Sequence, residues 1–109
     1  MTTSRVSFAH ESEAALAGLF DFYRIAWHYE PRSFPIVFNQ RGQAVAFFTP
    51  DFYLPELDLY IEVTAAKPEH NTRKNRKIRL LRQHHPQVRV KLLNRKDLER
   101  LFSRMRRAA

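Results

Sequence analysis

Two strand-like segments that face each other constrain the fold of this chain most. Residues 44–53 and residues 59–64 have the composition of strands, and the short connection Leu54–Asp58 joins them. In an antiparallel hairpin with this turn, Asp51 lies opposite Glu62, because residues whose numbers add to about 113 face each other. The same register pairs Tyr53 with Tyr60 and Thr49 with Thr64. The opposite face receives the apolar residues Phe48, Phe52, Leu59, Ile61 and Val63.

The opposed carboxylates Asp51 and Glu62 are the main chemical signal. Directly opposed side chains have Cβ atoms about 5 Å apart, and two like charges at that separation are destabilising. A divalent cation between the two groups removes the repulsion, and Mg²⁺ is commonly held by one or two carboxylates with water and phosphate oxygens. The alternative is structural, with an Arg or Lys from the basic half of the chain neutralising the pair in a salt bridge.

The remaining periodicities predict helices and strands on both sides of this hairpin. They are a helix from Ser12, as N-cap, to about Ile25; an irregular edge strand Trp27–Phe38, broken by Pro31 and Pro35; a helix Arg73–His85, ended by Pro86; a strand Val88–Leu93; and a helix Arg95–Arg107, capped by Asn94. The inner stripe of the second helix contains Ile78 and Leu81, with Lys74 and His85 as further candidates. The expected order is α-β-β-β-α-β-α, an α/β domain over residues 1–109 with a mixed central sheet flanked by helices.

Charge is strongly segregated along the chain. Residues 1–62 contain 4 Lys/Arg and 8 Asp/Glu, whereas residues 63–109 contain 15 Lys/Arg and 3 Asp/Glu. A basic half of this kind favours a polyanionic partner, most simply nucleic acid, over a merely solvated surface. The expected phosphate contacts come from one helix and carry no base-specific pattern. They are Arg73, Lys74, Arg76, Lys77, Arg79 and Arg82.

Several absences narrow the class of protein. The chain has no Cys, so a disulfide framework and a thiolate zinc site are excluded. No apolar run approaches the ~20 residues needed to cross a bilayer, and the opening MTTSRVSF is polar, so a cytoplasmic protein without membrane contact is expected. A Gly-rich phosphate loop is also absent, which argues against a nucleoside triphosphatase.

The residues Pro50-Asp51 and Glu62-Val63-Thr64, with ten residues between the two acids, resemble the signature of the PD-(D/E)XK nuclease superfamily. The run FTPDFYLPELDLYIEVT followed by a basic helix is similar to small stand-alone nuclease-like proteins of bacteria and to the transposase endonuclease subunit. The resemblance covers roughly residues 8–100. It implies a restriction-endonuclease-like core and a Mg²⁺-dependent endonuclease, with Mn²⁺ as a substitute. It further implies metal ligands from Asp51, Glu62 and the Val63 carbonyl.

The resemblance also implies further catalytic residues. The usual lysine of the superfamily, two residues after the glutamate, is replaced here by Thr64, which can hydrogen-bond a water but carries no charge. Members of the superfamily sometimes relocate functional residues, so the substitute is expected among Lys67, Lys74 and Lys77, with Lys77 and Lys67 preferred. Glu13 matches the acid of the first helix, on a helical row that faces the sheet. Its alternative role is a carboxylate that stabilises the first helical turn.

Three functions remain open on the sequence. The first is hydrolysis of phosphodiester bonds in DNA, in preference to RNA. The second is a catalytically silent nucleic-acid-binding module with the same fold. The third is an accessory subunit that docks on a larger enzyme through exposed aromatic residues such as Trp27 and Phe34. A homodimer would suit a nuclease that cuts two strands, although the sequence does not demand it.

Overall fold

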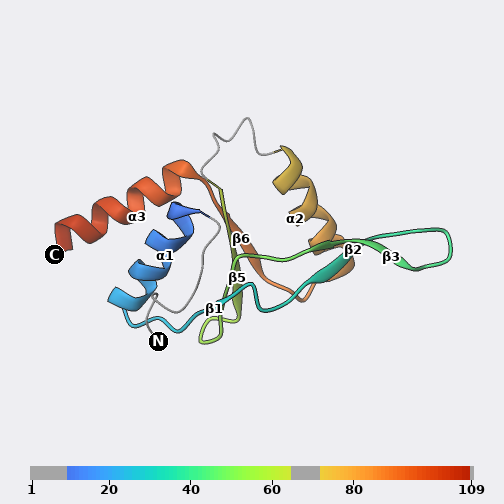
Figure 1. Cartoon of the computed structure of the whole chain (residues 1–109), viewed down its shortest axis with the longest axis horizontal. Helices are drawn as coiled ribbons and strands as arrows, with labels where there is room; N and C mark the ends of the chain where they lie inside the picture. The colour runs from blue at the N-terminus through green and yellow to red at the C-terminus, as the bar shows by residue number, and fades with distance from the viewer. Residues whose placement is uncertain (1–9, 65–71, 109) are drawn as a thin grey trace.

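The computed structural model describes residues 10–64 and 72–108, apart from the side chains of Arg95 and residues 105–108. Within this part the chain is a mixed α/β protein (Figure 1). Its elements in order are α1 (Glu11–Phe22), β1 (His28–Tyr29), β2 (Phe34–Phe38), β3 (Ala44–Phe48), β4 (Phe52–Leu54), β5 (Leu59–Val63), α2 (Thr72–His84), β6 (Val90–Leu93) and α3 (Arg95–Ala108).

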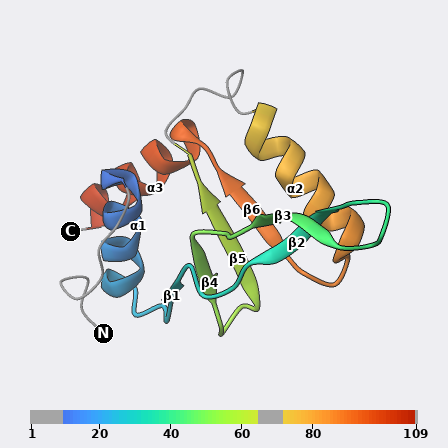
Figure 2. The same ribbon diagram turned by 45° about the vertical axis from the view of Figure 1, so that its right-hand side comes forward.

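The strands form two separate sheets. The larger sheet has the order β1-β4-β5-β6, with β5 and β6 parallel and the other neighbours antiparallel. β2 and β3 pair only with each other among the described strands. Helices α1 and α3 lie on one side of the larger sheet, while α2 and the β2–β3 hairpin lie on the other (Figures 1 and 2). The mixed sheet flanked by helices is therefore as predicted.

A buried cluster fills each side of the larger sheet. On the α1/α3 side, Phe52 is fully buried, and its ring contacts those of Phe20, Trp27 and Tyr29 at centroid distances of 5.5, 5.7 and 5.5 Å. The cluster on the α2 side consists of Phe34, Ile36, Phe48, Ile78, Leu81 and Val90. The sheet is thus covered on both faces, which explains why apolar side chains project from both faces of its strands.

The predicted hairpin register is confirmed. Phe52 pairs with Ile61, Tyr53 with Tyr60 and Leu54 with Leu59. The turn between the strands closes with Asp58 at φ 48°, in the left-handed region that Asp tolerates better than most residues. The rings of Tyr53 and Tyr60 lie 4.5 Å apart on the α2 side of the sheet.

The two long strands predicted at residues 27–38 and 44–53 are wrong, because each is split in two. β3 ends at Phe48, and Pro50, which has no N–H to donate, separates it from β4. Likewise, Glu30 adopts φ 46° before Pro31, and this turn separates β1 from β2. As a consequence Phe48 lies in the α2-side cluster instead of sharing a face with Phe52.

The aromatic side chains proposed as an exposed docking surface are also placed differently. Trp27 is 4% exposed and Phe34 is 0% exposed, so neither can anchor a partner enzyme. Trp27 packs against Phe52, and Phe34 contacts Tyr60 and His85. Their large apolar surfaces are buried in the core of the protein, which is more favourable than exposure to water.

The sequence predicted an N-cap residue for the first and the last helix. Helix α1 begins at Glu11, and its N-cap is His10, which makes no side-chain capping bond, so the prediction of Ser12 as cap is wrong. The predicted cap Asn94 is confirmed. Asp97 N–H donates to Asn94 Oδ1 at 3.0 Å, and Asn94 N–H donates to Asp97 Oδ2 at 2.9 Å. No described helix has the length and apolar character needed to cross a membrane.

Candidate functional site

Asp51 and Glu62 meet at the junction of β4 and β5. Asp51 precedes the first residue of β4, and Glu62 lies one residue before the end of β5. Asp51 N–H donates to Glu62 Oε1 at 3.1 Å, while Val63 N–H donates to Asp51 Oδ2 at 2.8 Å. Both side chains are buried, with exposed fractions of 8% and 6%. The hairpin thus brings the two carboxylates together as the sequence pattern predicts, and holds each by a backbone bond.

The surroundings of Asp51 favour its protonated form. Burial, followed by the neighbouring charge of Glu62, raises the pKa of Asp51 to about 7 from an ordinary value of 3.8. The hydrogen bond from Val63 N–H opposes this rise, the charge of Glu13 adds to it, and Lys74 lowers it. Acids with a raised pKa cluster at functional sites, so Asp51 is a candidate functional residue.

Glu13 is a third acid near this centre. It lies in the first turn of α1 and is 3% exposed, as its place on the sheet-facing row predicts. Tyr29 Oη donates a hydrogen bond to Glu13 Oε1, which fixes the carboxylate against β1. Because its charge contributes to the pKa of Asp51, Glu13 lies within electrostatic reach of the carboxylate pair.

Among the lysines that the structure describes, Lys74 reaches the carboxylates. Its Nζ lies 3.0 Å from Glu62 Oε2 and donates to the Val63 carbonyl oxygen at 2.7 Å. Lys77, one of the two preferred candidates, is half-buried on α2 and makes no hydrogen bond or ion pair with another described residue. The other, Lys67, lies outside the described residues.

The sequence contained a signal for Lys74. It shares the helical stripe of Ile78 and Leu81, which pack against the sheet, so its side chain is directed toward the end of β5. Lys77 lies about 60° around the helix from Lys74, at the edge of that stripe. The choice between them depends on how α2 is rotated against the sheet, and the buried stripe defines that rotation.

Thr64 and Val63 complete the centre at the end of β5. Thr64 is buried, and its N–H donates to the Leu93 carbonyl oxygen at 3.0 Å, which extends the pairing of β5 with β6. The Val63 carbonyl oxygen faces Lys74 Nζ. The predicted ligand oxygens of Asp51, Glu62 and Val63 therefore belong to one corner of the sheet.

The donor set is compatible with a hard cation but is not a complete cage. Two carboxylates and one carbonyl supply only oxygen ligands, which suit Mg²⁺. Within residues 10–64 and 72–108, no three His, Cys, Asp or Glu side chains are grouped closely enough to hold a metal ion. Mg²⁺ commonly keeps several waters and needs few protein ligands, so two carboxylates are sufficient. Here Lys74 provides the positive charge beside Glu62, as in the structural alternative to a metal site.

The predicted phosphate-binding residues lie around α2. Arg73, Arg76, Arg79 and Arg82 are exposed, whereas Lys74 and Lys77 are half-buried. Arg82 also donates through Nη2 to the Val90 carbonyl oxygen at 3.1 Å. The exposed residues present positive charge to solvent on the side of the sheet that α2 covers (Figure 2).

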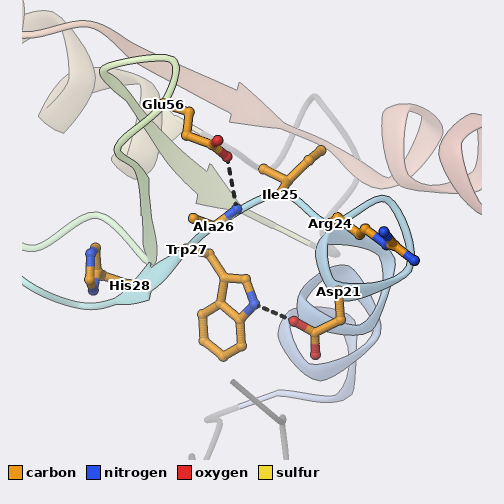
Figure 3. Close-up of a pocket in the computed structure, with 7 residues that line it drawn as sticks. All are labelled: Asp21, Arg24, Ile25, Ala26, Trp27, His28 and Glu56. Atoms are coloured by element: carbon orange, nitrogen blue, oxygen red, sulfur yellow. Dashed lines mark hydrogen bonds between the residues drawn. The ribbon is translucent and has the colours of Figure 1, made fainter.

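A pocket of about 490 Å³ lies away from the carboxylates, where α1 leads into β1. Figure 3 shows its lining: Asp21, Arg24, Ile25, Ala26, Trp27, His28 and Glu56. Trp27 Nε1 donates to Asp21 Oδ1 at 2.8 Å, and Ala26 N–H donates to Glu56 Oε1 at 3.3 Å. Both carboxylates of the lining thus already accept hydrogen bonds within the protein, and none of the lining residues is a predicted site residue.

Comparisons of the chain with protein-family models, with curated proteins and with solved structures give no match.

Proposed function

We propose that this chain is a metal-dependent nuclease of the PD-(D/E)XK kind that hydrolyses phosphodiester bonds of DNA. The observation that carries the proposal is the buried pair Asp51 and Glu62 with Lys74 beside it, at the junction of two paired strands. The restriction-endonuclease-like core is part of the same proposal. It is supported by a mixed sheet with helices on both faces and by the acids at the ends of adjacent strands.

Each residue of the centre has a role in the proposed reaction. Asp51, Glu62 and the Val63 carbonyl would hold Mg²⁺, which when bound would supply Lewis-acid polarisation of the scissile phosphate and of the attacking water. Glu13 would orient that water, and Thr64 is available to hydrogen-bond it. Lys74 would release both Glu62 and the Val63 carbonyl oxygen and pair with the phosphate, where it would stabilise the negative charge that develops during attack. The exposed arginines of α2 hold neighbouring phosphates.

The Lys74–Glu62 ion pair also favours a second function, a nucleic-acid-binding module that does not cleave. In that case Lys74 is a permanent substitute for the metal ion, and the centre is a structural salt bridge. Both functions use the same basic helix, so binding to DNA does not separate them. Only metal-dependent cleavage does.

Cleavage of a panel of DNA substrates tests the proposal. Single-stranded, double-stranded, nicked and branched DNA are incubated with the protein and Mg²⁺ or Mn²⁺, and product ends are resolved on a denaturing gel. The expected result is cleavage that chelation of the metal abolishes and that Asp51→Ala reduces by at least about 100-fold. If Asp51→Ala cuts as well as the wild type, the assignment is wrong. Salt-sensitive binding without cleavage would favour the second function.

A further inference from the structure

The β2–β3 hairpin projects from the body of the protein beyond α2, and we name residues 34–48 the arm (Figures 1 and 2). Phe34 and Phe48 are buried at its base against Ile78 and Leu81 of α2. In contrast, residues 39–43 at its tip are all exposed. A fixed base with a solvent-exposed tip is a geometry suited to reaching a partner.

The tip is held in one conformation by the side chain of Asn39. Its Oδ1 accepts hydrogen bonds from the N–H groups of Arg41 and Gln43 at 2.9 and 3.0 Å, and its Nδ2 donates to Gln43 Oε1 at 3.0 Å. Gly42 supplies φ +77° for the turn. The exposed side chains of Gln40 and Arg41 therefore extend from an ordered turn, which reduces the entropy lost on binding.

The arm and α2 adjoin, and neither contains an acidic residue. The arm contains one basic residue, Arg41, and α2 contains six Lys/Arg. The two elements are packed together, since the rings of Phe38 and His84 lie 5.0 Å apart and His85 Nε2 lies 2.8 Å from the Pro35 carbonyl oxygen. A basic helix beside an arm that carries no negative charge matches a polyanion that contacts both elements.

The shape and side chains of the arm favour the groove of a duplex over other polyanions. The major groove of DNA admits a two-stranded β-ribbon, and Arg and Gln are the side chains that read the edges of guanine and adenine. Val45 and Phe47 are more than half exposed along the arm and are suited to apolar contact with base methyl groups. Asp51 follows the arm after only two residues, so DNA held by the arm passes near the carboxylate centre.

We propose that the arm binds double-stranded DNA, with Gln40 and Arg41 inserted in a groove and the arginines of α2 on the flanking phosphates. This inference deepens the proposed nuclease function by naming the duplex as the substrate class. Its effect on cleavage rests on that function, but its effect on binding does not.

The test measures binding without divalent metal. Fluorescence anisotropy follows a labelled duplex about two helical turns long, in chelator and over a range of salt concentrations. Arg41→Ala is expected to weaken binding about tenfold, as loss of one arginine contact to a base edge does. The matched control is Arg100→Ala, which removes the same charge from α3 on the other side of the sheet and is expected to bind as the wild type does. Gln40→Ala combined with Arg41→Ala is expected to bind more weakly still.

Equal affinities of Arg41→Ala and Arg100→Ala would overturn the proposal, as would tighter binding to single strands than to the duplex. A third contradicting result is self-association through the arm, in which Phe47→Ser converts a dimer to a monomer in sedimentation while Arg41→Ala leaves DNA binding unchanged. Failure of the proposed nuclease function gives a different result from failure of the arm proposal. If the protein is not a nuclease, the wild type shows no metal-dependent cleavage, but Arg41→Ala still binds the duplex more weakly than the wild type.

Discussion

At the scale of single residues, the two carboxylates Asp51 and Glu62 differ in the groups that offset the cost of burying a negative charge. Glu62 has an ion pair with Lys74, whereas Asp51 has a hydrogen bond from Val63 N–H and two neighbouring acids. Burial and the neighbouring carboxylates therefore raise the pKa of Asp51. This raised pKa yields a prediction that is independent of activity.

The stability of the metal-free protein is expected to fall as pH rises from about 4 to about 7. The pKa of Asp51 is about 7 in the folded protein and 3.8 ordinarily, so between these values the folded state binds more protons than the unfolded state. Asp51→Asn removes this titration and keeps an oxygen that can accept the Val63 N–H. Urea denaturation should show the variant gaining on the order of 1–2 kcal/mol relative to the wild type between about pH 5 and pH 8. A difference that does not change with pH would contradict the raised pKa.

Lys74, a candidate that the sequence ranked below Lys77 and Lys67, is in contact with Glu62. Lys74→Met is expected to reduce metal-dependent cleavage by about 100- to 1,000-fold, because it removes a cation that stabilises developing charge on the phosphate. The control is Lys77→Met, which removes a neighbouring charge on the same helix and should retain nearly full cleavage. Equal losses in both variants, measured at equal DNA saturation, would show that general positive charge matters and not the contact with Glu62.

The pairing of Asp51 with Glu62 was predictable from the sequence, because strand alternation and turn length together fix a register. Which lysine of α2 contacts Glu62 was not predictable, since Lys74 and Lys77 lie three positions apart and only the packing of α2 separates them. Burial of Ile78 and Leu81 orients Lys74 toward β5. The inner stripe predicted for α2 already included Lys74, but the sequence analysis preferred Lys77 and Lys67 as substitutes for the missing lysine of the motif.

At the scale of elements, the predicted helices and strands were correct in kind but not in continuity. Alternating apolar residues predicted extended chain over residues 27–38 and 44–53, and local propensity cannot show where an extended segment leaves one sheet for another. Pro31 and Pro50 mark those points, because neither can donate to a sheet ladder. The consequence is the free-standing arm, which no periodicity in the sequence predicted.

The start of α3 provides a stability test at this scale. Asn94→Ala removes the acceptor for Asp97 N–H and is expected to lower the free energy of unfolding by about 1 kcal/mol. In a domain of this size the thermal midpoint should fall by roughly 4–8 °C. Asn94→Ser keeps a side-chain oxygen at the cap and should lose much less. If Ser and Ala variants unfold at the same temperature, the reciprocal capping bonds contribute nothing.

At the scale of the whole molecule, the separation of charge along the sequence becomes a separation in space. Asp51 and Glu62 meet at the junction of β4 and β5 with Glu13 within electrostatic reach, and the exposed arginines of α2 lie on the side from which Lys74 reaches the pair. A nuclease needs this arrangement, since its substrate is a polyanion and its metal ligands are anions. The bases attract the substrate, while the buried acids require a cation before they can approach a phosphate.

Calorimetric titration with Mg²⁺ or Mn²⁺ tests most directly whether Asp51 and Glu62 together hold a metal ion. The wild type is expected to bind one ion at this centre, and Glu62→Ala and Asp51→Asn are each expected to lose that binding while remaining folded by circular dichroism. Identical titrations of the wild type and both variants, or no heat of binding in the wild type at millimolar metal, would contradict the account.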